Sequence, residues 1–325
     1  MMHKLPFESI KRDTLVKKDP SSDDQYKKAD NKPVPELIQY GVVNIDKPPG
    51  PTSHQVSDFV QKILHIDKAG HSGTLDPQVT GVLPIALGKA TRVVQTLLTA
   101  GKEYVGIMHM HKKVPEDHLK RILKKFTGKI KQMPPIKSSV KRQWRFREVY
   151  YIDILEIKDQ DVLLRVGCEA GTYIRKLFHD IGKRMNIGAH MSELRRTKAG
   201  PFDESALFTL HDLADAYWYY KEEENEKYIR KIIQPVEDSV KHLPKVWALE
   251  SSVKTLCHGA NLKMPGIARL ESGIGKDDSV AIMTLKNELI ALGNAVVDSE
   301  TILKQEKGIG IKTNKVFMEP KSAGL

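Results

Sequence analysis

The chain has 325 residues, enough for two domains, and carries 52 Lys and Arg against 41 Asp and Glu, a net charge of +11. This balance favours a polyanionic partner, most often a nucleic acid, although a lysine-rich proteome gives the same sum. Two distant cysteines exclude a disulfide framework and a cysteine-rich metal site. Without an apolar run of membrane-span length or a secretory leader, we expect a cytoplasmic protein that does not bind membranes.

The charge is unevenly distributed along the chain. Residues 102–150 hold fourteen basic and four acidic residues, whereas residues 203–245 hold ten acidic and six basic ones. The basic stretch is therefore the more probable contact for a polyanion, and the acidic one a solvated connector.

Residues 1–40 mix charges and prolines and are typical of an extension without its own core, disordered or laid along another domain. Residues 41–50 form an apolar strand that ends in a rigid turn at Lys47, which by itself reads as a solvated turn lysine. Thr52 is placed to cap a helix. The apolar residues at helical spacing on its core face are Val56, Phe59, Val60, Ile63 and Leu64.

Residues 70–81, Gly-His-Ser-Gly-Thr-Leu-Asp-Pro-Gln-Val-Thr-Gly, are too irregular for a strand and too rich in glycine for a helix. Pro77 disfavours the α conformation at Asp76, so the one carboxylate of this stretch is expected at the tip of a stiff loop. Asp-Pro is also a common turn dipeptide, and a plain surface turn is the alternative.

The whole run from 70 to 92 resembles the signature loop of the TruB-type pseudouridine synthases, in particular their archaeal and eukaryotic dyskerin branch. The resemblance implies that Asp76 is the catalytic residue. It also implies that the segment around Lys47 packs against the catalytic loop, and we assign Lys47 and His71 to substrate binding.

After the loop, residues 91–98 predict a helix, and residues 101–105, which contain Tyr104, lead into a strand over 106–110. A tyrosine can be an ordinary strand aromatic, or it can stack on a nucleobase. The Lys102-Glu103-Tyr104 arrangement resembles the family motif whose tyrosine packs on the target base, and we favour that role.

A helix is expected from Pro115, followed by a basic, proline-interrupted segment over residues 132–147. Such a loop can neutralise phosphates while Trp144 and Phe146 stack on bases. Its position matches the RNA-gripping loop of the family, so Lys141 and Arg142 are assigned to RNA binding.

Residues 150–157 and 162–169 predict a hairpin, and Thr172 is expected to cap the helix that follows. Arg175 can be a surface arginine. The Gly-Thr-Tyr-Ile-Arg run, however, resembles the family motif whose arginine pairs with the catalytic aspartate. By the same resemblance Leu194 forms a wall of the base pocket.

From residue 245 onward, short strands at 246–249, 267–270, 279–285, 289–297 and 315–318 predict a compact β-barrel. The His258-Gly259-Ala260 run and the Pro265-Gly266-Ile267 turn resemble a PUA domain, an RNA-binding module. The alternative is a β-barrel that packs against the rest of the chain and does not bind RNA.

The expected fold is α+β. A mixed, largely antiparallel synthase domain with flanking helices (41–243) follows an N-terminal extension (1–40) and precedes a C-terminal PUA β-barrel (244–320).

Pseudouridine formation requires a flipped uridine and one carboxylate acting as nucleophile or base, and needs no cofactor. The sequence contains no P-loop, no dinucleotide fingerprint and no histidines at metal-ligand spacing, so we expect no cofactor or metal ion.

Three functions are considered, and we favour the first. The first is a guide-RNA-dependent synthase acting on ribosomal RNA, as in archaeal H/ACA ribonucleoproteins. The second is a stand-alone tRNA T-loop synthase, and the third is a non-catalytic RNA-binding scaffold. For the first, the resemblance implies a guide RNA and three small protein partners: a zinc-ribbon or peptide-like protein, a β-barrel protein and a kink-turn-binding protein.

Overall fold

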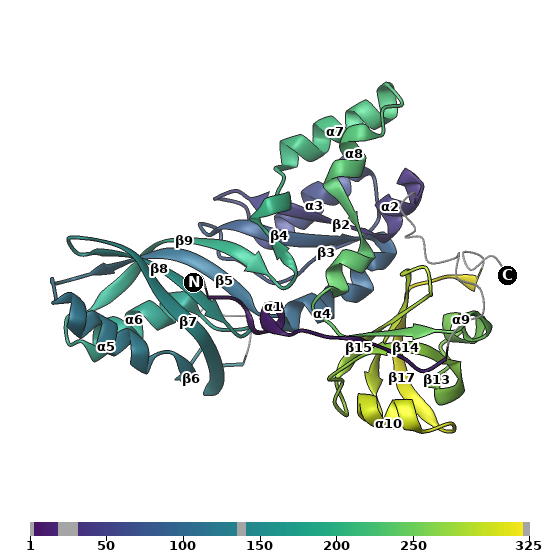
Figure 1. The fold of residues 1–325 in the computed structure, drawn as a ribbon. Helices are drawn as coiled ribbons and strands as arrows, with labels where there is room; N and C mark the ends of the chain where they lie inside the picture. The colour runs from purple at the N-terminus through teal and green to yellow at the C-terminus, as the bar shows by residue number, and fades with distance from the viewer. Residues whose placement is uncertain (1–2, 19–31, 135–140, 321–325) are drawn as a thin grey trace.

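The computed structural model describes residues 3–18, 32–134 and 141–320, and a ten-stranded sheet forms its larger body (Figure 1). The strand order is β11-β2-β4-β9-β5-β8-β7-β6, with β3 beside β4 and β10 beside β9. All of these pairs are antiparallel except β4–β9, which confirms the mixed, largely antiparallel sheet. The strands are β2 (Gly41–Lys47), β3 (Ala69–His71), β4 (Thr80–Leu87), β5 (Lys102–Met110), β6 (Gly128–Gln132), β7 (Arg145–Lys158), β8 (Asp161–Cys168), β9 (Ala189–Ala199), β10 (Phe202–Asp203) and β11 (Ile233–Pro235).

The parallel joint between β4 and β9 divides this sheet into two halves. Only Thr80 and Gly81 of β4 pair with Arg195 and Arg196 of β9. Gly81 has φ +100, and a Cβ there would lie 2.2 Å from the Arg196 carbonyl oxygen, so only glycine fits this crossing. The part of β9 before Arg195 has no described strand on its β4 side, and its first residues, 189–191, line a pocket that we call the cleft.

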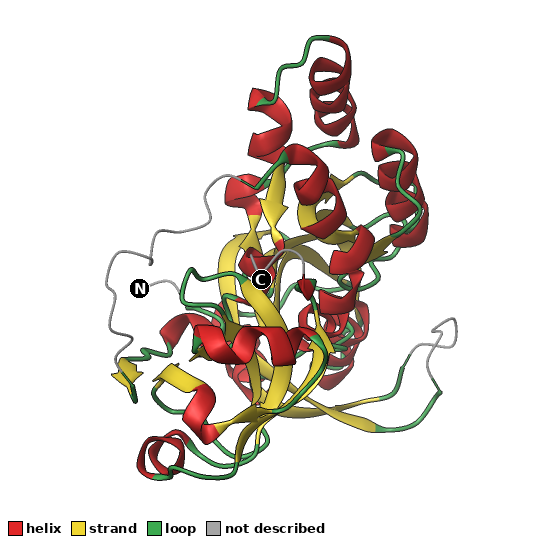
Figure 2. Ribbon diagram, turned by 90° about the vertical axis from the view of Figure 1, so that its right-hand side faces the viewer, coloured by secondary structure: helices red, strands yellow, loops and turns green. Residues whose placement is uncertain are grey.

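The first half-sheet is covered by helices whose buried faces form one core with β2 and β4. Thr52 caps α3 as expected, because its hydroxyl accepts from the Gln55 amide and the Gln55 side chain accepts from the Thr52 amide. The core face of α3 holds Val56, Val60 and Leu64. These helices are α2 (Val34–Tyr40), α3 (Ser53–Leu64), α7 (Leu210–Glu222) and α8 (Lys227–Ile232), of which α7 and α8 rise together above the sheet (Figures 1 and 2).

The expectation that Phe59 belongs to this core is wrong, because its side chain is 40% exposed. At about 100° per residue, Phe59 lies roughly 120° from the centre of the face that α3 buries. The spacing of apolar residues by itself therefore predicted a wider buried face on α3 than the structure has.

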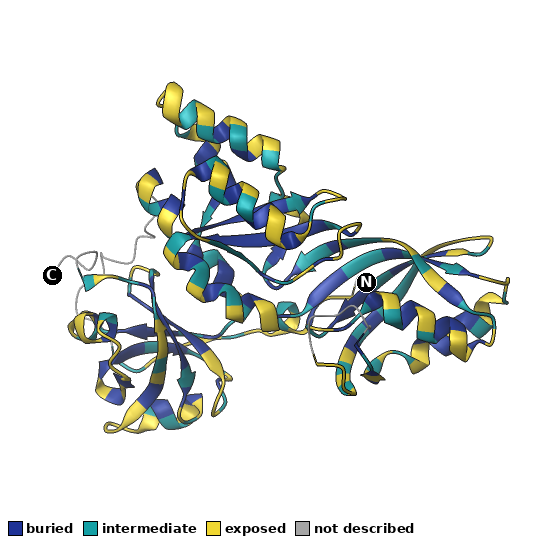
Figure 3. Ribbon diagram, turned by 180° about the vertical axis from the view of Figure 1, so that it is seen from behind, coloured by how far each residue is buried: buried dark blue, intermediate teal, exposed yellow. Residues whose placement is uncertain are grey.

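The second half-sheet is covered by α5 (Glu116–Lys125) and α6 (Ile174–Arg184), which alternate buried and exposed positions (Figure 3). The β7–β8 hairpin is confirmed. Thr172 does not cap α6, since the residue before the helix is Tyr173 and no side chain caps it. Instead, the Gln132 side chain accepts from the Tyr173 amide at 3.1 Å and donates to the Tyr173 carbonyl at 3.2 Å. These two bonds connect the end of β6 to the start of α6.

Between the half-sheets, the chain makes a 3-10 turn (Gly88–Val93) and then α4 (Val94–Thr99), in place of the single helix expected over 91–98. None of the helices in the described ranges is long and apolar enough to cross a bilayer.

The C-terminal part forms a seven-stranded sheet in the order β1-β14-β12-β15-β16-β17-β13. Its last long strand spans Ile309–Val316 rather than the expected 315–318, because Gly310 continues the strand instead of turning it. The elements are β12 (Lys245–Ala248), α9 (Glu250–Cys257), β13 (Leu262–Lys263), β14 (Ile267–Glu271), β15 (Ser279–Met283), β16 (Leu289–Ala295), α10 (Ser299–Lys304) and β17 (Ile309–Val316).

The N-terminal segment lies along both bodies (Figure 1). Its strand β1 (Thr14–Val16) pairs with β14, and Lys17 donates to the carbonyls of Ile302 and Gln305 at 2.6 Å. Nearer the terminus, Leu5 is fully buried before the short helix α1 (Pro6–Ser9). Of the two alternatives for this extension, its described part takes the second, lying along another domain.

A single apolar core joins the two bodies. It contains Val42, Val82 and Leu97 from the larger body together with Trp247 and Phe317 from the smaller one. Removing the C-terminal sheet would therefore expose buried residues of the rest.

Candidate active site

Asp76 lies in the loop between β3 and β4, at the joint of the half-sheets. The loop is fixed from several sides: the Leu75 amide donates to the Ser53 hydroxyl at 2.8 Å, and the Gly50 amide donates to the Pro77 carbonyl at 2.9 Å. Gly73 has φ +132, which favours glycine. The backbone is thus held, while the Asp76 side chain is about half exposed.

Arg175, on the first turn of α6, forms an ion pair with Asp76. The two residues are 99 positions apart in sequence, and both side chains remain more than half exposed. The guanidinium can hold the carboxylate in one orientation while leaving it open to a ligand.

Lys47 does not lie where the sequence assignment put it. Its side chain is fully buried, and its ammonium donates to the carbonyls of Pro48, Pro77 and Val79 at 2.8 to 3.0 Å. Burial, and next the charge of Arg196, lower the pKa of Lys47. Neither a solvated turn lysine nor a substrate contact fits this position, because all three bonds go to backbone around the Asp76 loop.

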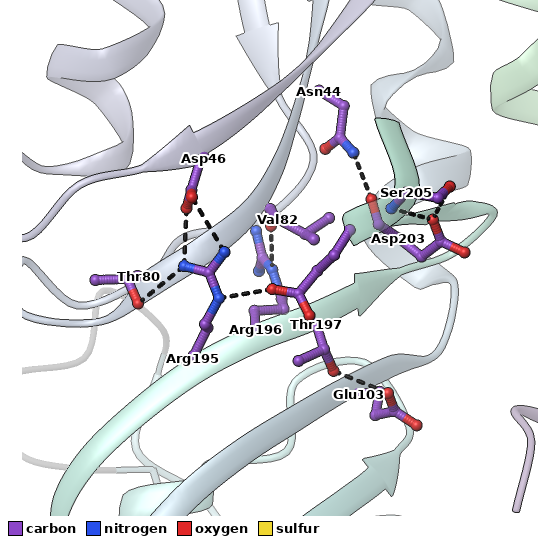
Figure 4. A network of polar contacts seen from close by, with 11 residues as sticks. Asn44, Asp46, Thr80, Val82, Glu103, Arg195, Arg196, Thr197, Asp203 and Ser205 are labelled. Atoms are coloured by element: carbon purple, nitrogen blue, oxygen red, sulfur yellow. Dashed lines mark hydrogen bonds and ion pairs between the residues drawn. The ribbon is translucent and has the colours of Figure 1, made fainter. Parts of the chain in front are cut away.

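Arg196 is the residue whose role sequence reasoning missed. It is almost completely buried, and its Nε donates to the Val82 carbonyl at 2.7 Å (Figure 4). Its Nη2 donates to the Gly73 carbonyl at 3.3 Å. Burial lowers the pKa of Arg196. Its only sequence signal was the Leu-Arg-Arg run, in which the two arginines look alike.

Arg195 has a different environment. It binds both carboxylate oxygens of Asp46, at 2.9 and 3.1 Å, and its Nε binds Glu204 at 2.6 Å (Figure 4). These contacts link β2, β9 and the 3-10 turn Glu204–Ala206. Because adjacent residues of a strand point to opposite faces, Arg196 of β9 lies in the core and Arg195 contacts the two carboxylates.

Tyr104 and His71 also lie close to Arg196. Tyr104 is opposite Arg196 in the β5–β9 register, and its hydroxyl hydrogen-bonds the guanidinium. Burial raises the pKa of Tyr104 and lowers that of His71. His71 is therefore neutral at pH 7, and its Nδ1 accepts weakly from the Gly73 amide at 3.4 Å.

Leu194 lies over β5 at Gly106, where a Cβ would come within 2.6 Å of the leucine side chain. It packs against the core that α6 covers. Leu194 is half-buried there.

The predicted RNA-binding loop is described only in part, because residues 135–140 lie outside the described residues. Lys141 and Arg142 are exposed. Trp144 and Phe146 are both 57% exposed, and the ammonium groups of Lys131 and Lys129 lie over their rings at 5.0 and 4.7 Å. A basic, aromatic surface therefore lies on β6 and β7.

The structure brings four of the predicted residues together: Arg175 pairs with Asp76 and lines the cleft, and Tyr104 and His71 lie near Arg196, which contacts the Asp76 loop. Among the described residues, no group of three or more His, Cys, Asp or Glu side chains is arranged to hold a metal ion. The site offers a carboxylate, an arginine, an aromatic ring and apolar walls.

Family models match almost the whole chain. A model of the TruB family pseudouridylate synthase N-terminal domain matches residues 61–118 and 109–174, and the tRNA pseudouridylate synthase B C-terminal domain matches 175–241. A DKCLD domain matches residues 14–57 and a PUA domain residues 244–317.

Close relatives are known from archaea. The chain is 56% identical over 312 residues to a probable tRNA pseudouridine synthase B of Pyrococcus furiosus, covering 95% of this chain and 92% of the relative. It is 52% identical over 318 residues to a protein of the same name in Methanopyrus kandleri, covering 98% and 94%.

Two solved structures are similar over 98% of both chains. One is a chain of a Cbf5–Nop10–Gar1 complex, with a TM-score of 0.93 and 55% identity. The other is a chain of an H/ACA ribonucleoprotein bound to a substrate RNA containing 2′-deoxyuridine, with a TM-score of 0.91 and 52% identity. The chain belongs to the TruB family and is an RNA pseudouridine synthase of the TruB/Cbf5 type with a C-terminal PUA domain.

Proposed function

We propose that this synthase is the guide-RNA-dependent catalytic subunit of an H/ACA ribonucleoprotein that modifies ribosomal RNA. The observation that carries the proposal is the similarity over 98% of the chain to a subunit of such a particle bound to substrate RNA. The N-terminal strand β1 supports it, because it fastens the segment before the catalytic domain to the C-terminal sheet.

In the proposed reaction the N1–C1′ bond of a flipped uridine breaks, the base rotates, and a C5–C1′ bond forms. The C5 proton is released and N1 gains one, so the reaction is an isomerisation without a redox step. Asp76 is the reacting carboxylate, either as a nucleophile towards C6 or C1′ or as the base that opens a glycal route. Its half-exposed side chain on a fixed backbone suits all three.

The other residues act around this carboxylate. Arg175 orients Asp76, the Tyr104 ring stacks on the base, and Leu194 closes one side of the pocket. Neutral His71 lies at the loop as an uncharged contact for the nucleotide. Lys47 and Arg196 are positioning residues, because they bind backbone carbonyls of the loop rather than the cleft.

RNA gripping is assigned to exposed basic groups. Lys141 and Arg142 neutralise phosphates of the substrate, and the PUA domain, which we place at 244–320, anchors the guide RNA. Protein partners comparable to Nop10 and Gar1, which accompany the similar Cbf5 chain, complete the particle.

A stand-alone tRNA synthase is the second candidate. It is favoured by the archaeal relatives at 52 to 57% identity, which are named as probable tRNA pseudouridine synthases B. A purely structural RNA-binding role is set aside by the family membership.

The deciding experiment measures pseudouridine formation on a ribosomal RNA fragment and on a tRNA transcript, with and without a matched guide RNA and the partner proteins. We expect modification of the ribosomal fragment only when the guide pairs with it. Efficient tRNA modification without guide or partners, and none of the ribosomal fragment, would support the second candidate instead.

Guide anchoring is tested with point variants rather than a truncation, because the two bodies share a core. Lys254 and Lys263 are exposed on either side of the 258–260 turn. Lys254→Ala with Lys263→Ala should weaken guide binding and reduce its salt dependence, without changing thermal stability. Unchanged affinity for the guide RNA would show that Lys254 and Lys263 do not bind it and that another surface anchors the guide.

A further inference from the structure

Lys102 is the first residue of β5 and lies two positions before Tyr104. It is only 5% exposed, and its ammonium donates to the carbonyls of Leu97, Leu98 and Ala100 at 2.6 to 2.8 Å. These carbonyls lie at the end of α4, where the helix itself supplies no donors. A cation at a helix C-terminus is also favoured by the helix dipole. Lys102 therefore closes the end of α4.

The end of α4 and the Lys102 side chain both contact the Asp76 loop. A Cβ at Gly73, three residues before Asp76, would lie 3.8 Å from Leu98 Cδ2 and 4.0 Å from Lys102 Cε. The same Cβ would lie 3.6 Å from Nη1 of Arg196. The loop backbone at Gly73 is thus in contact with a side chain of α4, with the lysine that closes α4, and with the buried arginine.

The other end of the Lys102 side chain is fixed by the sheet. In the register of β5, Lys102 is opposite Cys168 of β8 and Ala199 of β9, so its backbone is paired on both sides. Tyr104 points to the same face of β5, because side chains alternate along a strand. Lys102 therefore connects the loop that carries Asp76 to the strand that carries Tyr104.

We propose that Lys102 is a positioning residue for pseudouridine formation, whose ammonium holds the end of α4, and through it the Asp76 loop, in register with the Tyr104 ring. The inference rests on the roles proposed above for Asp76 and Tyr104. A displacement of about 1 Å between reacting groups can cost about 100-fold in rate. Since Lys102 is buried, its loss should lower turnover and leave RNA affinity unchanged.

The charge of Lys102 has no anionic neighbour among the groups that act on it. Arg196 faces it from β9 and is positive. Burial raises the pKa of Cys168 on β8 to about 12 and lowers the pKa of His242 to about 4, so both are neutral near pH 7. His71 on the catalytic loop is neutral as well, and α4, Val-Gln-Thr-Leu-Leu-Thr, has no titratable side chain.

These surroundings make the hydrogen bonds of Lys102 sensitive to pH. Burial, and next the charge of Arg196, lower the pKa of Lys102 to about 7, against about 10.4 for a lysine in water. The ammonium has three N–H groups for its three carbonyls, whereas the neutral amine has two. As the pH rises through the pKa, one carbonyl loses its donor, so the end of α4 should be held less firmly.

The test compares Lys102→Met, which removes the donors, with Lys102→Arg, which keeps a charge that does not titrate in this range. Single-turnover rates and Kd are measured with the partner proteins on a guide-matched ribosomal RNA fragment, from about pH 6 to about pH 8.5. Lys112→Met is the control, because Lys112 is exposed two residues beyond the end of β5. Rates are taken at a temperature where thermal melting shows the variants to be folded.

A further variant, Leu98→Ala, keeps the lysine and removes the contact between α4 and Gly73. Leu98 is 36% exposed, so this change leaves the core intact. It decides the proposal if Lys102→Met does not fold, because the same link to the loop is broken at its other end.

We expect Lys102→Met to react about tenfold more slowly or worse than the wild type at pH 6, with unchanged Kd. Lys102→Arg should recover most of this loss, and Leu98→Ala should slow the reaction by about threefold or more. The wild-type rate should fall above about pH 7 towards that of Lys102→Met, whereas Lys102→Arg should lack this fall. Lys112→Met should behave as the wild type.

The proposal is overturned if Lys102→Met, or Leu98→Ala in its place, reacts as fast as the wild type, or if rate and affinity fall together. The same fall above pH 7 in the wild type and in Lys102→Arg would also overturn it. Failure of the proposed function looks different, because then the wild type forms no pseudouridine on the guide-matched RNA. If that happens, the same variants are compared on a tRNA transcript.

Discussion

The cations that hydrogen-bond to the Asp76 loop come from three separate segments of the chain and fall into two groups with different roles. Lys47 and Arg196 are buried, contact backbone carbonyls, and face the loop from inside. Arg175 is more than half exposed and contacts the Asp76 carboxylate from the cleft side. Lys47 and Arg196 fix the position of the loop backbone, and the exposed ion pair between Arg175 and Asp76 fixes the orientation of the carboxylate.

This difference has an energetic reason. A buried ammonium or guanidinium is tolerated only when its donors are satisfied, and removing it leaves buried carbonyls without partners. An exposed ion pair contributes little to stability because water and salt screen it. Changes in the buried group should therefore alter both stability and turnover, whereas changes in the exposed pair should alter turnover alone.

The largest effect is expected for Asp76→Asn. The amide is isosteric with the carboxylate but can serve neither as nucleophile nor as base, so pseudouridine formation should fall by about 1,000-fold or more while RNA affinity stays near that of the wild type. Tritium release from labelled uridine measures the rate, with Asp67→Asn, at an exposed position, as the control. Near-normal turnover would remove Asp76 from the mechanism.

Lys47→Met tests the buried group. Three carbonyls lose their donor, and we expect a loss of about 3 kcal/mol in the free energy of unfolding together with a fall in turnover of about 100-fold. Denaturant unfolding and single-turnover rates are compared with Lys62→Met, an exposed lysine on α3. A variant with normal stability would show that the loop is held without this ammonium.

Arg175→Lys tests the exposed pair. Lysine keeps the charge but loses the planar fork, so turnover should fall by about tenfold or more with unchanged melting temperature and nearly unchanged RNA affinity. Arg184→Lys, at the other end of α6, is the matched control. Equal losses in affinity and turnover would place Arg175 on the RNA backbone.

The effect that is smallest at neutral pH concerns the pH dependence of stability, and it lies where the N-terminal segment meets the joint of the two bodies. His242 is buried against Phe7, and burial lowers its pKa to about 4. The unfolded chain binds this proton below about pH 6.5. The histidine therefore supports the folded state fully above that pH, and its contribution falls between pH 6.5 and 4, by up to roughly 3 kcal/mol.

His242→Gln should flatten this part of the pH dependence of the free energy of unfolding, and His258→Gln, at an exposed position, should not. Parallel pH profiles for the wild type and His242→Gln would show that His242 is protonated equally in both states.

Local patterns in the sequence determined much of the fold. The cap at Thr52, the helix that follows Pro115, and the turn between β7 and β8 all act over a few residues, and all are confirmed. Asp76 was picked out by the resemblance of residues 70–92 to a family signature loop, because an Asp-Pro pair between glycines is by itself equally typical of a surface turn. Its role in catalysis stays a prediction.

Only the tertiary structure decided which polar side chains turn inward. Lys47 meets the Pro77 carbonyl 30 residues away, and Arg196 meets Val82 across 114 residues. Adjacent positions in a strand point to opposite faces, so the sequence could not say which arginine of the Arg195-Arg196 pair was buried. The pairing of β1 with β14, more than 250 residues apart, likewise depends on how the two bodies pack, because strand pairing leaves no local signal in a three-residue segment.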